Sequence, residues 1–503
     1  MARCSFLKTI NDQPSTMLPD HPFRDYRGRR VTVLGLGSFG GGVGAVRFLV
    51  DRGAQVTISD ARPAEQLAES LAELEGLPVE RHLGGNDPAD VTGAELVVVN
   101  PAIKRDHPLL KAAAAAGVPL TSEMNLFWQH NRGRVAAVTG SNGKSTTTAL
   151  LHNILRQGPG KSWLGGNIGR SLLPDVDQIS PDDWVVLELS SFQLTDLDRL
   201  QVSPEVSVVT NFSPNHLDWH PSLDHYRWAK QSLLRWQTAK STAVLNADDP
   251  DVADWPSPGR RAWFGLTDAG RSGAFATVGG CIVRDNAGEV TWPLGDWLTL
   301  PGRHNLANAL GAIAAARACG ATREMVEAGI RTYQPLPHRL QFVGEVRGVK
   351  FYNDSLATTP ESAEVALEAF DRPIVLLAGG YDKHVDLSGM ARAIARKAKA
   401  VVLLGQTGPL IGELVRQTER NRCLVSPSQP DFPTAFAWAV AAAESGDVVV
   451  LSPGCASYDW FRNFADRGRR FEELVRGQLS VVSGEEGKSG VSGGIRAPTA
   501  GDN

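Results

Sequence analysis

Val135-Ala-Ala-Val-Thr-Gly-Ser-Asn-Gly-Lys-Ser-Thr146 is the stretch that decides the fold of this chain. The apolar run at 135–138 predicts a strand, and the residues after Thr146 predict a helix that ends near Arg156. A glycine-rich turn between a strand and a helix lets backbone N–H groups point at phosphates, and the helix N-terminus adds partial positive charge. The segment from Gly140 to Thr146 therefore predicts a phosphate-binding loop for ATP.

Two side chains of this loop have the chemistry that phosphate binding uses. Lys144 supplies a positive charge at the β- and γ-phosphates, and the Ser145 hydroxyl can be a ligand of Mg²⁺. Val138 stands where the usual GxxxxGK[ST] pattern has its first glycine. The alternative is a glycine-rich turn before an ordinary helix. It does not explain why a strand, a loop, a Lys-Ser pair and a helix follow one another at the spacing of a phosphate loop. The predicted ATP-binding loop consists of Gly140, Ser141, Asn142, Gly143, Lys144, Ser145 and Thr146.

Outward from this loop, short runs rich in β-branched residues alternate with helical patterns, which predicts an α/β fold of parallel sheets covered by helices. At about 150 residues per domain, a chain of 503 residues has room for three domains. Sequence breaks near Asn131-Arg-Gly133 and Gln334-Pro-Leu-Pro337 suggest the joints. The predicted division is an extension at 1–27, a Rossmann-like domain at 28–130, a central phosphate-loop domain at 131–334, a C-terminal Rossmann-like domain at 335–480 and a disordered tail at 481–503.

The composition excludes several classes of protein. A net charge of −4 gives no sign of nucleic-acid or membrane binding. No apolar stretch approaches the roughly 20 residues of a membrane span, and no signal peptide is recognisable. The five cysteines form no metal-type cluster and suit a reducing compartment, so we expect a cytoplasmic enzyme.

A carboxylate and a histidine follow two predicted strands of the central region. Glu188 ends the apolar run 184–187, and ligand crevices of parallel sheets lie at the carboxyl ends of strands. A carboxylate there, beside a phosphate loop, is suited to hold Mg²⁺, although a surface Glu after a strand is the alternative. His216 follows the strand predicted at 206–210. Taken alone, it is more often structural than catalytic.

Lys230 lies in a helix predicted from Leu223 to about Trp236, with Ser222 as its N-cap. Apolar residues three and four positions away place the lysine within or beside the apolar stripe. Burial there would lower the pKa of the amine, and a neutral amine can react with CO₂ to give an anionic carbamate. The equally weighted alternative is a lysine whose stem covers apolar surface while its head reaches solvent.

The first predicted domain contains Gly35-Leu-Gly-Ser-Phe-Gly40, a GxGxxG pattern after the strand 31–34. Asp60 stands about 20 residues further on, so this pattern alone predicts an NAD-binding oxidoreductase. Glycines that serve only tight helix–strand packing are a further alternative. A lone GxGxxG motif is weak evidence for NAD binding, and the phosphate loop is the better-specified site.

The shortened GxxGK[ST] loop resembles that of the Mur ligases and their folylpolyglutamate relatives. The resemblance extends in order through Gly166-Asn-Ile-Gly169, Glu188-Leu-Ser-Ser-Phe-Gln193, Asn211 to Asp218 and Ala229-Lys230. It continues through Pro301-Gly-Arg-His-Asn-Leu-Ala-Asn308, Leu336-Pro-His-Arg339, Gly379-Gly-Tyr-Asp-Lys383 and Ser452-Pro-Gly-Cys-Ala-Ser457. These motifs cover about residues 30 to 475 and are most similar to the branch that adds glutamate to UDP-N-acetylmuramoyl-L-alanine.

The resemblance implies a role for each matching residue. Catalysis would use Lys144, Glu188, His216 and Lys230, and two Mg²⁺ ions would be held by Ser145, Glu188, His216 and a carbamylated Lys230. Outside the phosphate loop, ATP would contact Asn305, Asn308, Arg339 and Asp354. The UDP-sugar would contact Ser38, Phe39, Asp60, Arg62 and Asn167, and glutamate would contact Thr358, Lys383, Ser457 and Phe464.

Three positions depart from the pattern of the resembling branch. Asn215 precedes the histidine where an acidic residue is more usual, and Asn100-Pro-Ala-Ile103 replaces Ser-Pro-Gly-Ile. Leu356, in Asp354-Ser-Leu-Ala-Thr-Thr-Pro360, replaces a lysine expected near glutamate and phosphate. The choice between D-glutamate and L-glutamate therefore stays open, with D-glutamate expected.

The resemblance implies an ATP-dependent ligase of peptidoglycan precursor synthesis that works as a monomer through an acyl phosphate. Its rivals are another amino-acid-adding Mur ligase, a nucleotide-gated binding protein without catalysis, and an NAD oxidoreductase. The ELSSFQ and SPxCAS matches argue against the first, and intact Lys144, Glu188, His216 and Lys230 argue against the second.

Overall fold

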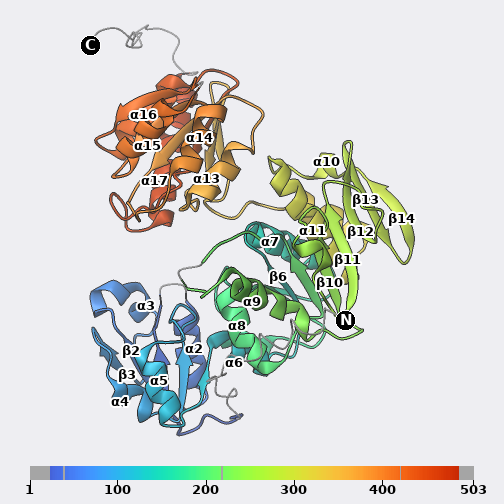
Figure 1. The fold of residues 1–503 in the computed structure, drawn as a ribbon, viewed down its shortest axis with the longest axis vertical. Coiled ribbons are helices and arrows are strands. Elements are labelled where there is room, and N and C mark those ends of the chain that lie inside the picture. The colour runs from blue at the N-terminus through green and yellow to red at the C-terminus, as the bar shows by residue number, and fades with distance from the viewer. Residues whose placement is uncertain (1–22, 38–39, 217–218, 420, 486–503) are drawn as a thin grey trace. The chain divides into compact units, whose positions relative to one another are not determined.

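The computed structural model describes residues 23–37, 40–216, 219–419 and 421–485 and contains three sheets (Figure 1). The chain forms two compact units, one of residues 1–298 and 307–333 and the other of residues 299–306 and 334–503. The first unit holds two of the sheets and the second unit holds the third. The parallel-rich sheets with covering helices confirm the predicted α/β class.

The first sheet has five parallel strands in the order β3-β2-β1-β4-β5. Apolar side chains on its two faces pack against α2 and α6 on one side and α4 and α5 on the other. Its elements are β1 Arg30–Leu34, α2 Gly41–Asp51, β2 Gln55–Asp60, α3 Ala68–Ala72, β3 Val79–Leu83, α4 Pro88–Thr92, β4 Leu96–Val99, α5 Pro108–Ala115, β5 Leu120–Thr121 and α6 Glu123–His130.

The second sheet has nine strands in the order β14-β13-β12-β11-β10-β9-β6-β8-β7. The strands from β7 to β12 are parallel, whereas β12, β13 and β14 pair antiparallel, an extension that the predicted parallel sheet lacked. The elements are β6 Arg134–Thr139, α7 Lys144–Leu155, β7 Ser162–Gly166, β8 Trp184–Glu188, α8 Ser191–Leu197, β9 Val206–Val209, α9 Leu223–Arg235, β10 Thr242–Asn246, β11 Arg260–Gly265, β12 Gly273–Thr277, β13 Gly280–Asp285, β14 Gly288–Trp292, α10 Leu294–Trp297, α11 Arg303–Ala318 and α12 Arg323–Arg331.

The third sheet has six strands in the order β15-β16-β20-β17-β18-β19, parallel except for the pair β15 and β16. Helices α13, α14 and α15 pack against one face of this sheet, and α16 and α17 pack against the other. Its elements are β15 Gln341–Val346, β16 Val349–Asn353, α13 Pro360–Leu367, β17 Ile374–Gly379, α14 Ser388–Lys397, β18 Ala398–Leu404, α15 Gly408–Gln417, β19 Leu424–Ser428, α16 Phe432–Ala442, β20 Val448–Leu451 and α17 Phe464–Glu485.

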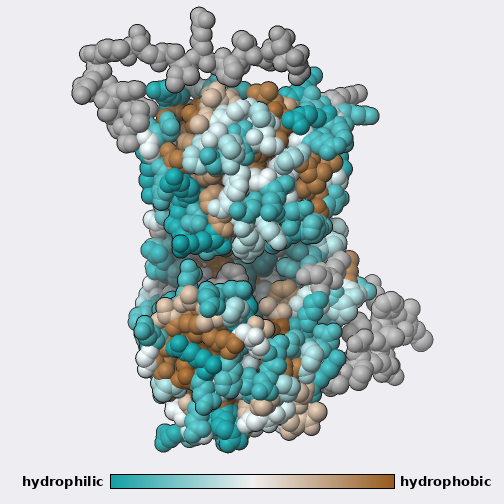
Figure 2. Space-filling model, turned by 90° about the vertical axis from the view of Figure 1, so that its left-hand side faces the viewer, coloured by the Kyte–Doolittle hydropathy of each residue, from teal (hydrophilic) through white to brown (hydrophobic). Residues whose placement is uncertain are grey.

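The surface agrees with the mixed composition of the chain. Hydrophilic residues cover much of the face shown in Figure 2, with hydrophobic residues gathered in separate patches. In the part of the chain that the structure describes, no helix combines the length and the hydrophobicity of a bilayer span.

Candidate nucleotide and magnesium site

The predicted phosphate loop connects β6 to α7, and its glycines adopt positive φ angles. Gly143, with φ of 79°, is the N-cap of α7. A Cβ at Gly140 would lie 1.9 Å from Thr210 Oγ1, and a Cβ at Gly143 would lie 2.2 Å from Asn308 Oδ1. Both positions therefore need glycine, because close packing as well as backbone conformation excludes a side chain.

Two lysines converge on this loop. Lys144 Nζ donates to the carbonyls of Gly140 at 3.1 Å and Ser141 at 2.9 Å. Lys230 Nζ, from α9, donates to the Gly140 carbonyl at 2.6 Å. Lys230 is 1% exposed and lies over the Tyr226 ring, so its head does not reach solvent. Burial and the neighbouring Lys144 hold the pKa of Lys230 well below its ordinary value, while Glu188 opposes this shift.

Glu188 is the last residue of β8 and is 2% exposed. Its Oε1 accepts a hydrogen bond from Asn167 Nδ2 at 2.9 Å. Its Oε2 is buried and has no hydrogen-bond partner within the described residues. A buried carboxylate oxygen without a donor is costly unless a cation supplies the missing interaction. The pair Asn167 and Glu188 is therefore suited to hold Mg²⁺.

His216 lies after β9 with a left-handed φ of 54° and an exposed side chain. Its N–H is capped by Asn215 Oδ1 at 2.8 Å, so the residue that departs from the family pattern supports the turn. The imidazole lies 5.0 Å from the Phe192 ring, measured between centroids. Ser145 lies in the first turn of α7 and is 7% exposed.

In the first sheet, Asp60 ends β2 and accepts hydrogen bonds from Leu36 N at 2.9 Å and Arg62 Nη2 at 2.8 Å. Burial raises the pKa of Asp60, but the hydrogen bonds from Arg62 and the backbone outweigh it and leave the pKa lowered. Asp60 and Arg62 thus lie at the glycine-rich turn after β1. Of the other three residues predicted to contact the UDP-sugar, Asn167 pairs with Glu188, and Ser38 and Phe39 lie outside the described residues.

In the second unit, Asp354 follows β16 and is 7% exposed. Its carboxylate accepts hydrogen bonds from Leu340 N at 3.0 Å and from the Ser452 hydroxyl at 2.7 Å. Burial raises the pKa of Asp354 to about 6. Arg339 is half-buried, and its Nε has no hydrogen-bond partner within the described residues.

The predicted glutamate-binding residues belong to the second unit, three of them on loops and one at the start of a helix. Thr358 is half-buried, Lys383 is exposed, Ser457 is 2% exposed and Phe464 begins α17. Two of the residues predicted to contact ATP lie on α11, where Asn305 belongs to this unit and Asn308 to the first. Asn305 donates to the Pro301 carbonyl at 2.7 Å.

Arg467, on α17, is a residue that sequence reasoning missed. It is 1% exposed and donates from Nε to Ser355 Oγ at 2.9 Å, from Nη2 to the Ser355 carbonyl at 2.9 Å and from Nη1 to the Cys455 carbonyl at 3.1 Å. Burial lowers the pKa of its guanidinium to about 10. Arg467 therefore ties the loop before Thr358 to the loop before Ser457. In the sequence, Arg467 is recognisable only as a cationic residue beside the apolar stripe of a predicted helix.

Sites that transfer phosphoryl groups from nucleotides combine a phosphate loop with a carboxylate at the end of a neighbouring parallel strand. This chain has both features, and the buried Lys230 of α9 is bonded to the loop. Three family models match along the chain: "Mur ligase MurD-like, N-terminal domain" at residues 29–122, "Mur ligase middle domain" at 138–316 and "Mur ligase, glutamate ligase domain" at 338–455. The chain belongs to the Mur ligase family.

Two relatives illustrate the similarity. UDP-N-acetylmuramoylalanine–D-glutamate ligase of Pelotomaculum thermopropionicum is 37% identical over 463 residues, covering 92% of this chain and 100% of that protein. The enzyme of the same name from Symbiobacterium thermophilum is 39% identical over 450 residues, covering 89% and 97%.

Solved structures of the family share the fold. UDP-N-acetylmuramate–alanine ligase of Thermotoga maritima matches with a TM-score of 0.58 at 21% identity, covering 90% of this chain and 100% of that one. MurF of Acinetobacter baumannii matches with a TM-score of 0.55 at 18% identity, covering 94% and 96%.

Proposed function

We propose that this chain is an ATP-dependent ligase that joins D-glutamate to UDP-N-acetylmuramoyl-L-alanine in peptidoglycan precursor synthesis. The observation that carries the proposal is the match over almost the whole chain, at 37–39% identity, to relatives that bear the name of this enzyme. The geometry supports it, because the phosphate loop and Glu188 lie at the carboxyl ends of neighbouring parallel strands, and Lys230 of α9 donates to the loop carbonyl of Gly140.

The reaction proceeds in two steps. The alanine carboxylate attacks the γ-phosphorus of ATP, ADP leaves, and an acyl phosphate forms. The glutamate amine then attacks the acyl carbon, and inorganic phosphate leaves from the tetrahedral intermediate. Lys144 neutralises charge on the transferred phosphoryl group, and electrostatic stabilisation of this kind provides most of the catalysis in phosphoryl transfer.

Ser145, Glu188, His216 and Lys230 are the proposed holders of two Mg²⁺ ions. The ions would supply positive charge to the phosphoryl oxygens. The residues fit, since Glu188 Oε2 is buried and receives no hydrogen bond from the residues that the structure describes, and Lys230 is a buried amine with a lowered pKa. The neutral Lys230 amine adds to the carbon of CO₂ and releases one proton, which leaves a carbamate with anionic oxygens.

The other site residues keep the roles that the resemblance implies. Arg339 and Asp354 contact ATP, as do Asn305 and Asn308, while Asp60, Arg62, Ser38, Phe39 and Asn167 contact the UDP-sugar. Glutamate is bound by Thr358, Lys383, Ser457 and Phe464. In this proposal the three domains keep the predicted boundaries, and the enzyme is a cytoplasmic monomer.

The test is phosphate release from ATP with UDP-N-acetylmuramoyl-L-alanine, offering D-glutamate and L-glutamate separately. Release with D-glutamate alone is the expected result. Release with L-glutamate alone would correct the stereochemistry, and release with neither would overturn the proposed reaction.

A further inference from the structure

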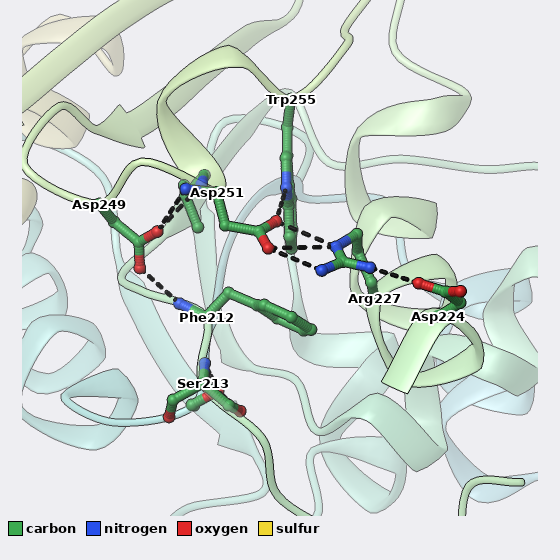
Figure 3. Close-up of polar contacts among 9 residues, drawn as sticks. Phe212, Ser213, Asp224, Arg227, Asp249, Asp251 and Trp255 are labelled. Carbon is green, nitrogen blue, oxygen red and sulfur yellow. Dashed lines mark hydrogen bonds and ion pairs between the residues drawn. The ribbon is translucent and has the colours of Figure 1, made fainter. Parts of the chain in front are cut away.

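We infer that Asp249, in the loop after β10, is a positioning residue for the nucleotide site, acting through Phe212 on the phosphate loop. The inference rests on the proposed nucleotide site and assigns a role to a network outside it. Figure 3 shows this network, in which Asp249 lies on one side of Phe212 and Arg227 with Asp251 on the other.

Asp249 holds the backbone of the segment after β9. Its Oδ2 accepts a hydrogen bond from Phe212 N at 2.7 Å (Figure 3). Its Oδ1 accepts from Asp251 N at 2.9 Å and from Val252 N at 3.1 Å. The Asp249 carboxylate therefore links the backbone of Phe212 to the turn that contains Asp251. Bonds from backbone N–H groups to an ionised carboxylate are stronger than neutral ones.

Arg227 of α9 closes the network from the other side. Its Nε and Nη2 donate to the Asp251 carboxylate at 3.0 and 2.7 Å, and its guanidinium lies 4.8 Å from the Phe212 ring centroid. The hydrogen bonds from Arg227 lower the pKa of Asp251, so the pair is ionised at neutral pH. Trp255 Nε1 adds a bond to Asp251 at 2.9 Å. Phe212 is thus fixed both by its backbone and by its ring.

The residues before and after Phe212 in the chain both form hydrogen bonds with the phosphate loop. Asn211 Oδ1 accepts from Asn142 N at 2.8 Å, and Asn211 Nδ2 donates to the Asn142 carbonyl at 3.1 Å. Ser213 N donates to Ser141 Oγ at 2.9 Å. Any displacement of Phe212 therefore moves partners of two consecutive loop residues.

The Phe212 ring provides a second route to the same loop. It lies 5.3 Å from the Tyr226 ring, and the Tyr226 hydroxyl is 3.2 Å from Ser141 Oγ. Ser141 also accepts the bond from Ser213, so both routes end at one hydroxyl. Since nucleotide binding depends on where the loop N–H groups point, we expect loss of Asp249 to weaken nucleotide affinity.

The experiment uses the full chain and compares Asp249→Asn with a matched control, Asp183→Asn. Asp183 lies at the amino end of β8 and accepts bonds from Lys161 N and Ser180 N at 3.1 Å and from Trp163 Nε1 at 2.9 Å. Both variants replace a loop-organising carboxylate of the same sheet. The control lies at the strand end opposite the phosphate loop.

The measurement is the affinity for a fluorescent ADP analogue with Mg²⁺, together with the midpoint of thermal unfolding. We expect Asp249→Asn to weaken binding about tenfold, the effect of losing one hydrogen bond to a charged group. Asp183→Asn should lower the midpoint but keep wild-type affinity. Arg227→Lys keeps the positive charge but loses the contact of two guanidinium nitrogens with Asp251, so it should weaken ADP binding by a smaller factor. This variant replaces Asp249→Asn in the test if Asp249→Asn does not fold.

Wild-type nucleotide affinity in folded Asp249→Asn, or equal weakening in Asp183→Asn, would overturn the inference. If the wild-type chain itself bound no ADP, the proposed ATP-dependent function would fail first and this inference with it. Binding with normal affinity but no phosphate release with glutamate would count against the proposed reaction alone.

Discussion

Lys230 and Lys144 donate hydrogen bonds to the same backbone carbonyl, that of Gly140, from Nζ atoms at 2.6 and 3.1 Å. Two ammonium groups so close to one acceptor repel each other, and burial of Lys230 removes the water that would screen them. The neutral form of Lys230 relieves the repulsion and leaves Lys144 charged, as the proposed mechanism requires. This arrangement makes Lys230 a nucleophilic amine at a pH where exposed lysines are protonated.

We therefore predict that Lys230 takes up CO₂. Enzyme prepared in CO₂-free buffer should lose most of its activity and regain it when bicarbonate is added. Incubation with ¹³C-bicarbonate should give one carbamate signal in the ¹³C NMR spectrum. Lys230→Arg, whose guanidinium stays protonated, serves as the control and should show neither the signal nor the recovery. Full activity in CO₂-free buffer would contradict the prediction.

Glu188→Gln tests the unpaired carboxylate oxygen. The amide keeps the size of the side chain and an acceptor for Asn167, but it loses the negative charge next to Lys230. We expect kcat to fall about 100-fold, a typical loss when one electrostatic group of a transition state is removed.

The same variant should not lower the free energy of unfolding, because the buried Glu188 Oε2 that it replaces has no hydrogen-bond partner within the described residues to lose. The control is Glu205→Gln, whose carboxylate pairs with Arg134 at the amino end of the same sheet. Retained activity in Glu188→Gln would show that the reaction does not need a carboxylate at this position.

The sequence predicted the fold best where the pattern was strictly local. The strands at 31–34, 135–138 and 448–451 are buried parallel strands, and such strands form continuous apolar runs. Ser222 is the N-cap of α9 as predicted, with its hydroxyl accepting from His225 N. The antiparallel strands β12 to β14 were missed, because short strands with Gly273, Gly280 and Gly288 resemble loops in sequence.

In the candidate site, too, the sequence predicted local patterns but not contacts between distant residues. The phosphate loop and Glu188 follow directly from strand–loop–helix patterns. The role of Arg467 depends on Ser355 and Cys455, which lie 112 and 12 residues away along the chain. Asp249 likewise meets Phe212 across 37 residues. No local period encodes such contacts, so a single sequence cannot reveal them.

The buried Asp354 carboxylate predicts a pH dependence of stability. Its pKa is raised from 3.8 to about 6 in the folded chain, so the folded state holds a proton in this window that the unfolded state has lost. The free energy of unfolding should therefore fall as pH rises from about 4 to about 6, by on the order of 3 kcal/mol at most.

Asp354→Asn cannot titrate and should flatten this part of the profile. The measurement is urea unfolding of the full chain at several pH values, followed by a probe in the third sheet. Identical pH profiles for wild type and variant would show that Asp354 ionises in the folded state as it does in the unfolded one.

Leu356→Lys tests whether the loop 354–359, which follows β16, selects the amino acid in the proposed reaction. Leu356 is half-buried, and its backbone is fixed by a bond from its N–H to the His338 carbonyl at 3.0 Å. If the loop binds glutamate as proposed, the new cation attracts a dicarboxylate, and we expect the KM for D-glutamate to fall roughly fivefold, about 1 kcal/mol.

The KM for ATP and the KM for each glutamate isomer are measured in parallel. Leu410→Lys, at an exposed position on α15, adds the same charge elsewhere on the unit and should change none of them. A preferential gain for D-glutamate would mean that the residue at 356 helps to fix the side-chain carboxylate of that isomer. Equal gains for both isomers would mean that it adds only general attraction, and stereoselectivity would then depend on the neighbouring residues Thr358 and Ser457.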